Sequence, residues 1–227
     1  MASGTQTYGI DVSHWDDAID WDKTVTDAAN PKINFCYAKA SQLHQYSDPS
    51  KPPQCPDAYF AANWAALARL QIPRGAYFYC EPYFTPKQMA DEFFARYTPQ
   101  HGDLPPSLDI EDEYLASMNS KKYTAQQNVQ QILDFAALVS AQIWGAKPLI
   151  YIRGDICHAL GNPPQFSAYP LWLAEYKTTA ATVLGPWQNY TFWQYAEDGN
   201  RAGFPNPNSV DLDWFNGPAA NLTTLRI

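Results

Sequence analysis

The sequence predicts an α/β protein folded as an irregular TIM-like β/α barrel, with five βα units followed by three further strands. Three observations lead to this fold class. Short apolar runs rich in β-branched and aromatic residues recur along the 227 residues. The earlier runs alternate with helical patterns, and there are enough runs to close a barrel. The length suits a single catalytic domain, 1–227, and we find no repeat or linker that would divide it.

Eight segments have the composition of strands. They are Tyr8–Val12, Ile33–Ala38, Gly75–Cys80, Pro106–Glu111, Pro148–Ile152, Leu171–Glu175, Thr191–Tyr195 and Val210–Asp213. Their alternation with helices predicts a parallel sheet, because parallel strands need crossover connections. After residue 152 the connections are rich in Pro, Gly and Asn, so we expect the last third of the barrel to be irregular. The tail, 218–227, is too short to form a domain.

Helices are predicted between the earlier strands. Thr124 and Gln127 form a capping box at the start of the clearest helix. Its apolar positions recur with helical spacing, and we expect Gly145 to end it as the C′ residue. Thr85, followed by proline at the first helical position, starts a second helix. A third is expected over 57–70.

The composition is that of a globular protein with many aromatic rings and an acidic balance. Aromatic residues make up 15% of the chain, and they could fill a core or line a groove that stacks on sugars. The net charge of -8 disfavours nucleic acid and anionic membrane surfaces as partners. No run reaches the roughly 18 apolar residues of a membrane span. The opening MASGTQT lacks the pattern of a signal peptide, so we expect a chain made without a leader or a mature form.

The cysteines and histidines show no metal-ligand spacing. The four cysteines could pair in three ways, and disulfides remain open, but Cys36 and Cys80 lie in apolar runs and are interpreted as buried thiols. No Gly-rich phosphate loop or G-x-S-x-G motif is present, which argues against nucleotide binding and serine hydrolase chemistry. We therefore expect neither a metal nor a cofactor. The other cysteines and the histidines are Cys55, Cys157, His14, His44, His101 and His158.

The stretch SLDIEDEY, 107–114, is the first candidate for a catalytic segment. Asp109 and Glu111 are two residues apart, so on a strand both project to one face, with Cα atoms about 6.5–7 Å apart. Active sites of parallel barrels are built at the carboxyl ends of the strands. Glycoside hydrolysis needs such a pair, one acid to protonate the leaving oxygen and one carboxylate to stabilise positive charge. Taken alone, a solvated strand end explains the cluster as well, and we assign Asp112 and Glu113 to such a loop.

Two further strand ends favour the catalytic interpretation. Asp11 follows the first apolar strand, while Asp211 and Asp213 lie in the last. In a closed barrel the first and last strands are neighbours, so Asp11 and Asp211 are expected to meet at the same mouth. A helix cap for Asp11 or a turn for Asp211 would each be acceptable alone. Acids at the ends of three strands together predict an acidic catalytic mouth.

Eight sequence blocks together resemble a known family. The chain contains, in order, YGIDVSHW, NFCYAKAS, RGAYFYCEP, LPPSLDIE, PLIYI, PLWLAEY, FWQYAEDG and VDLDWFNG. They resemble the strand blocks of the glycoside hydrolase family 25 lysozymes, the Chalaropsis-type N-acetylmuramidases that include many phage endolysins. The resemblance covers about 8–217. It implies hydrolysis of the β-1,4 bond from N-acetylmuramic acid to N-acetylglucosamine in peptidoglycan. The expected partner is the peptidoglycan glycan strand, met outside the cytoplasm by a secreted or phage-released monomer.

The resemblance also implies roles for single residues. Glu111 matches the family's general acid, and Asp109 matches the carboxylate that stabilises the cationic transition state or its oxazolinium product. Asp11 and Asp211 match the other two acids of the mouth. For Trp172 and Trp193, core packing is an equal alternative to a groove role. The residues with expected groove roles are Tyr77, which matches a family aromatic, and, by extension, Tyr79, Trp172, Tyr176 and Gln194.

Three departures from the family pattern concern the groove. The second strand continues as KASQL, 39–43, where many members have K-A-T-E-G. The following loop, 43–56, is longer and richer in proline, and the third strand reads YFY, 77–79, instead of Y-H-F. None of these changes removes one of the four acids. They affect the expected shape of the groove and its glycan preference.

The expected mechanism uses the substrate's own 2-acetamido group. Glu111 protonates the glycosidic oxygen while Asp109 orients that group, which attacks the anomeric carbon with net retention. Rotamers can place the carboxyl oxygens at the ~5 Å of a direct nucleophile or the ~6.5–9.5 Å of an inverting water, so the outcome stays open. One rival is a non-catalytic glycan-binding barrel, against which the intact acids count. Another is a chitinase-like hydrolase, whose D-x-x-D-x-D-x-E signature the chain lacks.

Overall fold

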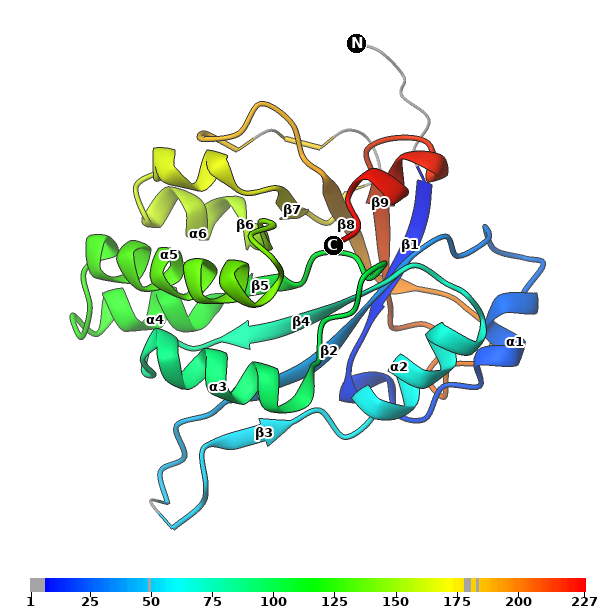
Figure 1. The fold of residues 1–227 in the computed structure, drawn as a ribbon, viewed down its shortest axis with the longest axis horizontal. Coiled ribbons are helices and arrows are strands. Elements are labelled where there is room, and N and C mark those ends of the chain that lie inside the picture. The colour runs from blue at the N-terminus through cyan, green and yellow to red at the C-terminus, as the bar shows by residue number, and fades with distance from the viewer. Residues whose placement is uncertain (1–6, 49, 178–180, 183) are drawn as a thin grey trace.

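A closed barrel of eight strands, with a ninth strand added outside it, forms the centre of the protein. The structure is a computed structural model and describes residues 7–48, 50–177, 181–182 and 184–227. The strands follow the order β1-β9-β8-β7-β6-β5-β4-β2-β3, and pairing of β1 with β2 closes the barrel (Figure 1). The predicted irregular β/α barrel is thus confirmed. The segment 1–6, where a leader pattern was sought, lies outside the described residues.

The strand bounds agree with the prediction to within two residues, except at the end of β8, which extends to Gly199 instead of Tyr195, and around the second strand. That strand runs over 36–43 instead of 33–38, and β3 was not predicted. Residues 39–43 remain extended, and β3 pairs with Ser41, Gln42 and Leu43 along β2. The strands are β1 Thr7–Val12, β2 Cys36–Leu43, β3 Gln54–Pro56, β4 Arg74–Cys80, β5 Ser107–Ile110, β6 Leu149–Arg153, β7 Leu171–Ala174, β8 Phe192–Gly199 and β9 Val210–Phe215.

The last strand departs from the predicted parallel sheet. β9 runs antiparallel to both β8 and β1, whereas the barrel strands from β1 through β2 and β4 to β8 pair in parallel. Its connection to β8, 200–209, is too short for a crossover helix and reverses the chain. The start of β9 therefore lies at the mouth formed by the carboxyl ends of the other strands. The first and last strands are neighbours as predicted, and the Cα atoms of Asp11 and Asp211 face each other.

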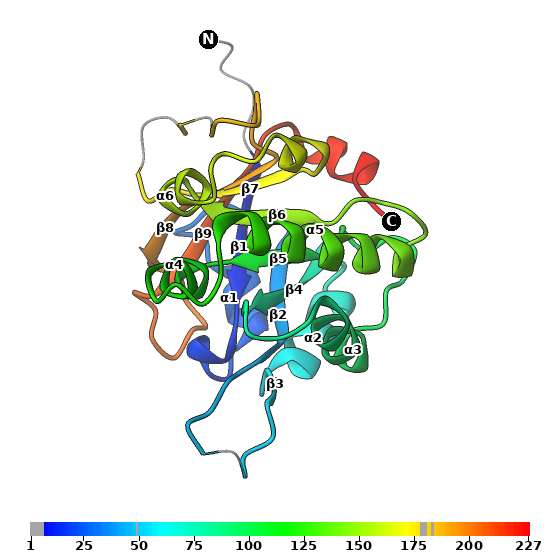
Figure 2. The same cartoon turned by 90° about the vertical axis from the view of Figure 1, so that its left-hand side faces the viewer.

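Helices cover the outside of the barrel, and the predicted N-terminal caps are present. Thr85 and Thr124 each complete a capping box, at the starts of α3 and α5. Figures 1 and 2 show α2, α3 and α5 packed around the strands β2 to β6. The helices are α1 Trp21–Thr26, α2 Phe60–Arg69, α3 Pro86–Arg96, α4 Asp112–Asn119, α5 Ala125–Gln142 and α6 Gly154–Ala159, with 3-10 helices η1 His14–Asp16, η2 Pro164–Ala168 and η3 Ala219–Thr224.

Two helix predictions need correction. Helix α5 ends at Gln142, and the residue in the C′ position is Trp144, with a φ of 54°. Gly145 comes one place later, where its N–H donates to Ser140 O at 2.9 Å, the long bond of a Schellman motif. Asp112 and Glu113 do not belong to a loop. They form the first turn of α4, where negative charge suits the helix N-terminus.

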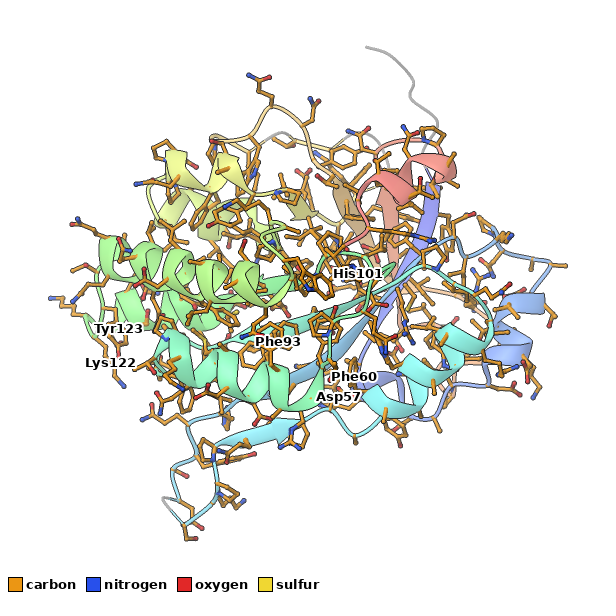
Figure 3. The ribbon with its side chains drawn as sticks, viewed as in Figure 1. Asp57, Phe60, Phe93, His101, Lys122 and Tyr123 are labelled. Atoms are coloured by element: carbon orange, nitrogen blue, oxygen red, sulfur yellow. The ribbon has the colours of Figure 1, made fainter. Side chains whose placement is uncertain are left out.

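The core has two parts, one inside the barrel and one between the barrel and the helices. The inner part is largely aromatic and contains Phe35, Tyr37 and Trp172. A Cβ atom at Gly75 would lie 2.1 Å from the Tyr37 ring, so glycine makes room for this filling. The outer part includes Phe93 of α3 (Figure 3).

The cysteines are free thiols, and the interpretation of Cys36 and Cys80 as buried is confirmed. None of the helices in the described ranges is both long and apolar enough to cross a membrane.

Candidate active site

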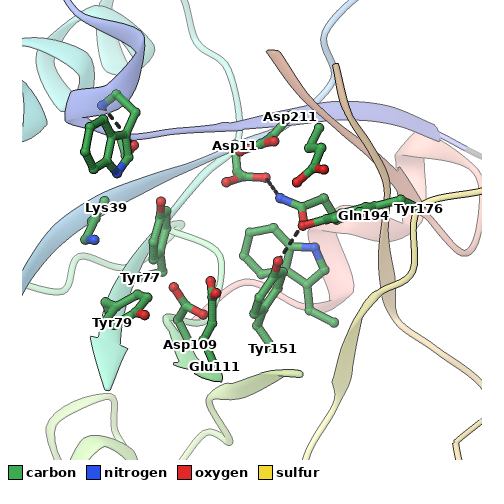
Figure 4. A pocket seen from close by; sticks show the side chains of 14 residues that line it. Asp11, Lys39, Tyr77, Tyr79, Asp109, Glu111, Tyr151, Tyr176, Gln194 and Asp211 are labelled. Carbon is green, nitrogen blue, oxygen red and sulfur yellow. Dashed lines mark hydrogen bonds between the residues drawn. The ribbon is translucent and has the colours of Figure 1, made fainter. Parts of the chain in front are cut away.

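A cavity of about 340 Å³ opens at the mouth of the barrel. The four expected catalytic acids and the five expected groove residues line it, and Figure 4 shows their side chains converging on one space. The same cavity is lined by five residues that were not assigned to a site. The expected residues are Asp11, Tyr77, Tyr79, Asp109, Glu111, Trp172, Tyr176, Gln194 and Asp211, and the additional ones are Ser13, Trp15, Lys39, Tyr151 and Glu197.

Asp109 and Glu111 lie side by side at the end of β5 (Figure 4). Glu111 is the N-cap of α4 and not part of the strand, but its extended backbone, φ -126° and ψ -156°, continues the alternation of the strand. Both side chains therefore face the cavity. Oδ1 of the Asp109 carboxyl group is buried without a hydrogen-bond partner among the described residues.

Burial is the main cause that raises the pKa of both carboxyl groups. For Asp109, which is 5% exposed, the negative charge of Glu111 raises the pKa further. For Glu111 the charge of Glu113 acts in the same direction. The ammonium group of Lys39 opposes these effects in both cases. Both carboxyl groups therefore hold a proton more readily than free side chains do, and Glu111 is the member that is less deeply buried.

Asp11 is held by a relay of hydrogen bonds from the neighbouring strands. Its Oδ2 accepts from Gln194 Nε2 at 2.8 Å, and Gln194 Oε1 accepts from the Tyr151 hydroxyl at 2.6 Å (Figure 4). Burial raises the pKa of Asp11 to about 7, against the lowering effect of the bond from Gln194. The relay fixes the orientation of this carboxyl group. It was not visible in the sequence, although Tyr151 lies opposite Asp109 in the sheet register.

Asp211 and Asp213 approach Asp11 from β9. Burial, followed by the charge of Asp11, raises the pKa of both well above the usual range. Asp213 is fully buried and its Oδ1 accepts from Trp172 Nε1 at 2.8 Å. In the sequence, Asp213 was noted without a role at the site. The alternation that placed Asp109 beside Glu111 would also have placed Asp213 beside Asp211.

Lys39 reaches the cavity by the alternation of β2, two residues after the inward-facing Tyr37, and a β-bulge then brings Gln42 to the same side. The register of β2 against β4 shifts between Lys39 and Ser41, so that Gln42 lies beside Lys39. Lys39 Nζ donates to Gln42 Oε1 at 2.7 Å and lies 4.5 Å from the centroid of the Tyr79 ring. A bulge has no dependable signal in a single sequence. Residues three apart on a regular strand would face opposite sides.

The aromatic residues divide between floor, rim and outer core. Trp172 is 2% exposed and forms the floor, where its ring centroid lies 5.1 Å from that of Tyr151, so it serves both core and cavity. Tyr176 stands at the rim with 48% of its surface exposed. The Tyr79 hydroxyl donates to Glu113. Trp193 lies in the outer core and does not line the cavity.

The chemistry available here is proton transfer and charge stabilisation. Across the described ranges, no group of three or more His, Cys, Asp or Glu side chains is placed to hold a metal ion. Two adjacent carboxyl groups with raised pKa values, at the mouth of a barrel and surrounded by aromatic rings, are an arrangement suited to glycoside hydrolysis. The fold and the site together define a glycoside hydrolase.

Comparison with known proteins identifies the family. The family described as glycosyl hydrolases family 25 matches residues 10–204, so the chain belongs to this family, as the sequence predicted, and is a glycoside hydrolase. Lysozyme M1 of Streptomyces globisporus is 30% identical over 230 residues, which cover 98% of this chain and 71% of the relative. The bacterial lysozyme of Streptomyces coelicolor superposes with a TM-score of 0.81 at 28% identity, covering 99% of this chain and 98% of that one. A muramidase of Acremonium alcalophilum gives 0.75 at 25% identity, covering 96% and 98%.

Proposed function

We propose that the protein is a lysozyme, a 1,4-β-N-acetylmuramidase that cleaves the bond from N-acetylmuramic acid to N-acetylglucosamine in peptidoglycan. The observation that carries the proposal is the pair of Asp109 and Glu111, side by side at a mouth that also holds Asp11 and Asp211. The lysozyme and muramidase relatives support the choice of polymer and bond. The enzyme acts on the cell wall outside the cytoplasm. One chain supplies the whole cavity, which supports action as a monomer with a single catalytic domain.

In this proposal Glu111 is the general acid. It carries a proton when sugar binds and donates it to the glycosidic oxygen, because its side chain is less deeply buried than that of Asp109. Asp109 is left ionised and accepts the N–H of the substrate's 2-acetamido group. Lys39 supports this state, since its positive charge lowers the pKa of Asp109 against the effect of burial.

The acetamido oxygen then attacks the anomeric carbon from the opposite face. Asp11 and Asp211 supply negative potential around the developing positive charge, and the bond from Gln194 keeps Asp11 in place. Water opens the oxazolinium ring with Glu111 acting as base, which gives net retention. The proton that leaves Glu111 in the first step returns to it in the second.

Loss of turbidity of a peptidoglycan suspension tests hydrolysis. Glu111→Gln is expected to lower the clearing rate at least about 100-fold, the usual contribution of general acid catalysis, while sedimentation with peptidoglycan is retained. Asp112→Asn is the matched control, because Asp112 is adjacent, exposed and paired with Arg153 outside the cavity. Wild type that binds peptidoglycan without clearing it would establish a non-catalytic binding barrel and refute the proposal.

Two product analyses test the bond and the mechanism. Mass spectrometry of borohydride-reduced products should find muramic acid at the reducing end; N-acetylglucosamine there would indicate a glucosaminidase or chitinase-like bond preference. NMR during the first minutes of reaction should show the β-anomer first. An initial α-anomer would reject retention and leave the choice of bond intact.

A further inference from the structure

A second hollow, of about 460 Å³, lies beside the catalytic cavity on the side of β2 and β3. The two spaces share Trp15, Lys39 and Tyr79 in their walls, so these three side chains form the boundary between them. The volume falls within the roughly 300–1,000 Å³ of small-ligand sites. The catalytic steps described above make no use of this hollow.

Trp15 presents an exposed ring on a fixed backbone at this boundary. Its surface is 80% exposed. The preceding His14 is bound twice by Asp57 Oδ2, through its backbone N at 2.8 Å and its Nδ1 at 3.0 Å. The Asp57 side chain is fully buried, and Figure 3 shows the residue between β3 and α2. A ring held in this way loses little conformational freedom when it stacks on a flat ligand face.

The 43–56 loop supplies a second ring. Tyr46 is 36% exposed, and its ring packs edge-on against His44 with centroids 4.7 Å apart. Its hydroxyl lies 3.0 Å from Cys55 Sγ on β3, and His44 Nδ1 lies 2.8 Å from the buried Glu81. Tyr46 is therefore positioned by contacts on two sides. The loop that departs from the family pattern forms one wall of the hollow.

The floor is polar because of the bulge in β2. Lys39 and Gln42 point into the hollow together, and they offer an ammonium and an amide to hydroxyl and carbonyl groups. Three carboxyl groups, those of Asp57, Glu81 and Glu113, also line it, against one lysine. This balance disfavours the acidic stem peptides of peptidoglycan. It is compatible with an uncharged sugar that stacks on aromatic rings.

We propose that the second hollow is a further sugar subsite, which binds an N-acetylhexosamine of the same glycan strand whose neighbouring units occupy the catalytic cavity. This inference rests on the proposed function, since it assumes a glycan substrate. The protein then binds long strands more tightly than short ones. The rings of Trp15 and Tyr46 are the stacking surfaces, and Tyr46 belongs to the second hollow alone.

Calorimetric titration of Glu111→Gln with stem-free peptidoglycan oligosaccharides tests the subsite without turnover. The octasaccharide is expected to bind more tightly than the tetrasaccharide. Adding Tyr46→Ala should weaken octasaccharide binding about fivefold, as expected for loss of one aromatic contact. Tyr46→Phe should restore it, because the ring and not the hydroxyl stacks. Trp144→Ala, which removes an exposed ring after α5, is the matched control and should have no effect.

The outcomes separate this inference from the proposed function. Octasaccharide affinity within twofold of the parent in Tyr46→Ala, with an unchanged thermal midpoint, would overturn the subsite. If Tyr46→Ala weakens the binding only of octasaccharides that carry stem peptides, the hollow binds the peptide, and the proposed sugar subsite is overturned as well. Long oligosaccharides could bind more tightly than short ones, in a way that requires Tyr46, while the wild type hydrolyses no peptidoglycan. That result would refute the proposed lysozyme activity and support the sugar subsite.

Discussion

Replacing Asp11 with asparagine should stabilise the protein at neutral pH while impairing its activity. Asp11 is 4% exposed, and burial raises its pKa from 3.8 to about 7. The folded state therefore holds a proton that the unfolded chain releases near pH 4. The contribution of Asp11 to the free energy of unfolding is fully present below pH 3.8 and is lost as the pH rises to about 7. Asparagine is neutral at every pH, and its oxygen still accepts the bond from Gln194.

The size of the effect follows from the pKa change. A rise from 3.8 to about 7 corresponds to about 4 kcal/mol, since one pKa unit is worth about 1.36 kcal/mol. The charges of Asp211 and Asp213 interact with that of Asp11, so replacing Asp11 alone recovers only part of this free energy. We therefore expect Asp11→Asn to raise the free energy of unfolding by about 2–4 kcal/mol at pH 8 and by less than about 0.5 kcal/mol at pH 3.5.

Urea unfolding followed by tryptophan fluorescence measures this difference at pH 3.5, 5, 6.5 and 8. Asp198→Asn is the control, because Asp198 is exposed on β8, and its effect should be small at each pH. A stability gain that is the same at pH 3.5 and pH 8 would show that burial of charge is not its cause. A less stable variant at pH 8 would refute the reasoning altogether. Activity should fall in either case if Asp11 stabilises the transition state.

Three further substitutions test the packing, the helix caps and the relay to Asp11. Gly75→Ala places a Cβ 2.1 Å from the Tyr37 ring and should lower the free energy of unfolding by about 2–3 kcal/mol in urea titrations. Thr124→Ala removes the N-cap of α5 and should cost about 1 kcal/mol in the same assay. Tyr151→Phe removes the hydroxyl that orients Gln194 and should lower kcat/KM about tenfold with an unchanged unfolding midpoint.

Each of these substitutions has a matched control. Gly154→Ala brings a Cβ only to 3.1 Å from the flexible Leu184 side chain and should cost much less than Gly75→Ala; equal losses would contradict the clash argument. Thr124→Ser keeps the capping oxygen and should remain close to wild type. Tyr114→Phe removes a buried hydroxyl that has no hydrogen-bond partner among the described residues, away from the cavity. Equal activity loss in Tyr114→Phe and Tyr151→Phe would refute the role of the relay.

Local patterns in the sequence were enough to predict much of this fold. Strand periodicity separates the inward from the outward side chains, and this rule alone was enough to place Asp109 and Glu111 on one face. Closure of the barrel brought Asp11 to Asp211, because chain ends meet when eight strands form a ring. Capping boxes at Thr85 and Thr124 were equally local signals.

The features that escaped prediction depend on pairing between distant segments. The bulge beside Ala40 exists in the register of β2 against β4, so it cannot be read from β2 alone. β9 is antiparallel because its connection from β8 is short. The length of this connection is visible in the sequence, but the alternation of the earlier strands and helices led to the prediction of a parallel sheet. The relay from Tyr151 through Gln194 to Asp11 joins three strands. The spacing of residues along the sequence does not show which side chains of different strands bond to each other.

The added strand β3 has a consequence for how this enzyme can diverge. The ring of eight strands is closed by the pairing of β1 with β2, and β3 pairs with the C-terminal end of β2. Insertions or deletions between Leu43 and Gln54 therefore alter the wall of the second hollow without breaking a hydrogen bond of the ring. The length of this loop can therefore change without a change in the catalytic residues. Exchange of this loop between relatives offers a route to new glycan length preferences on an unchanged catalytic centre.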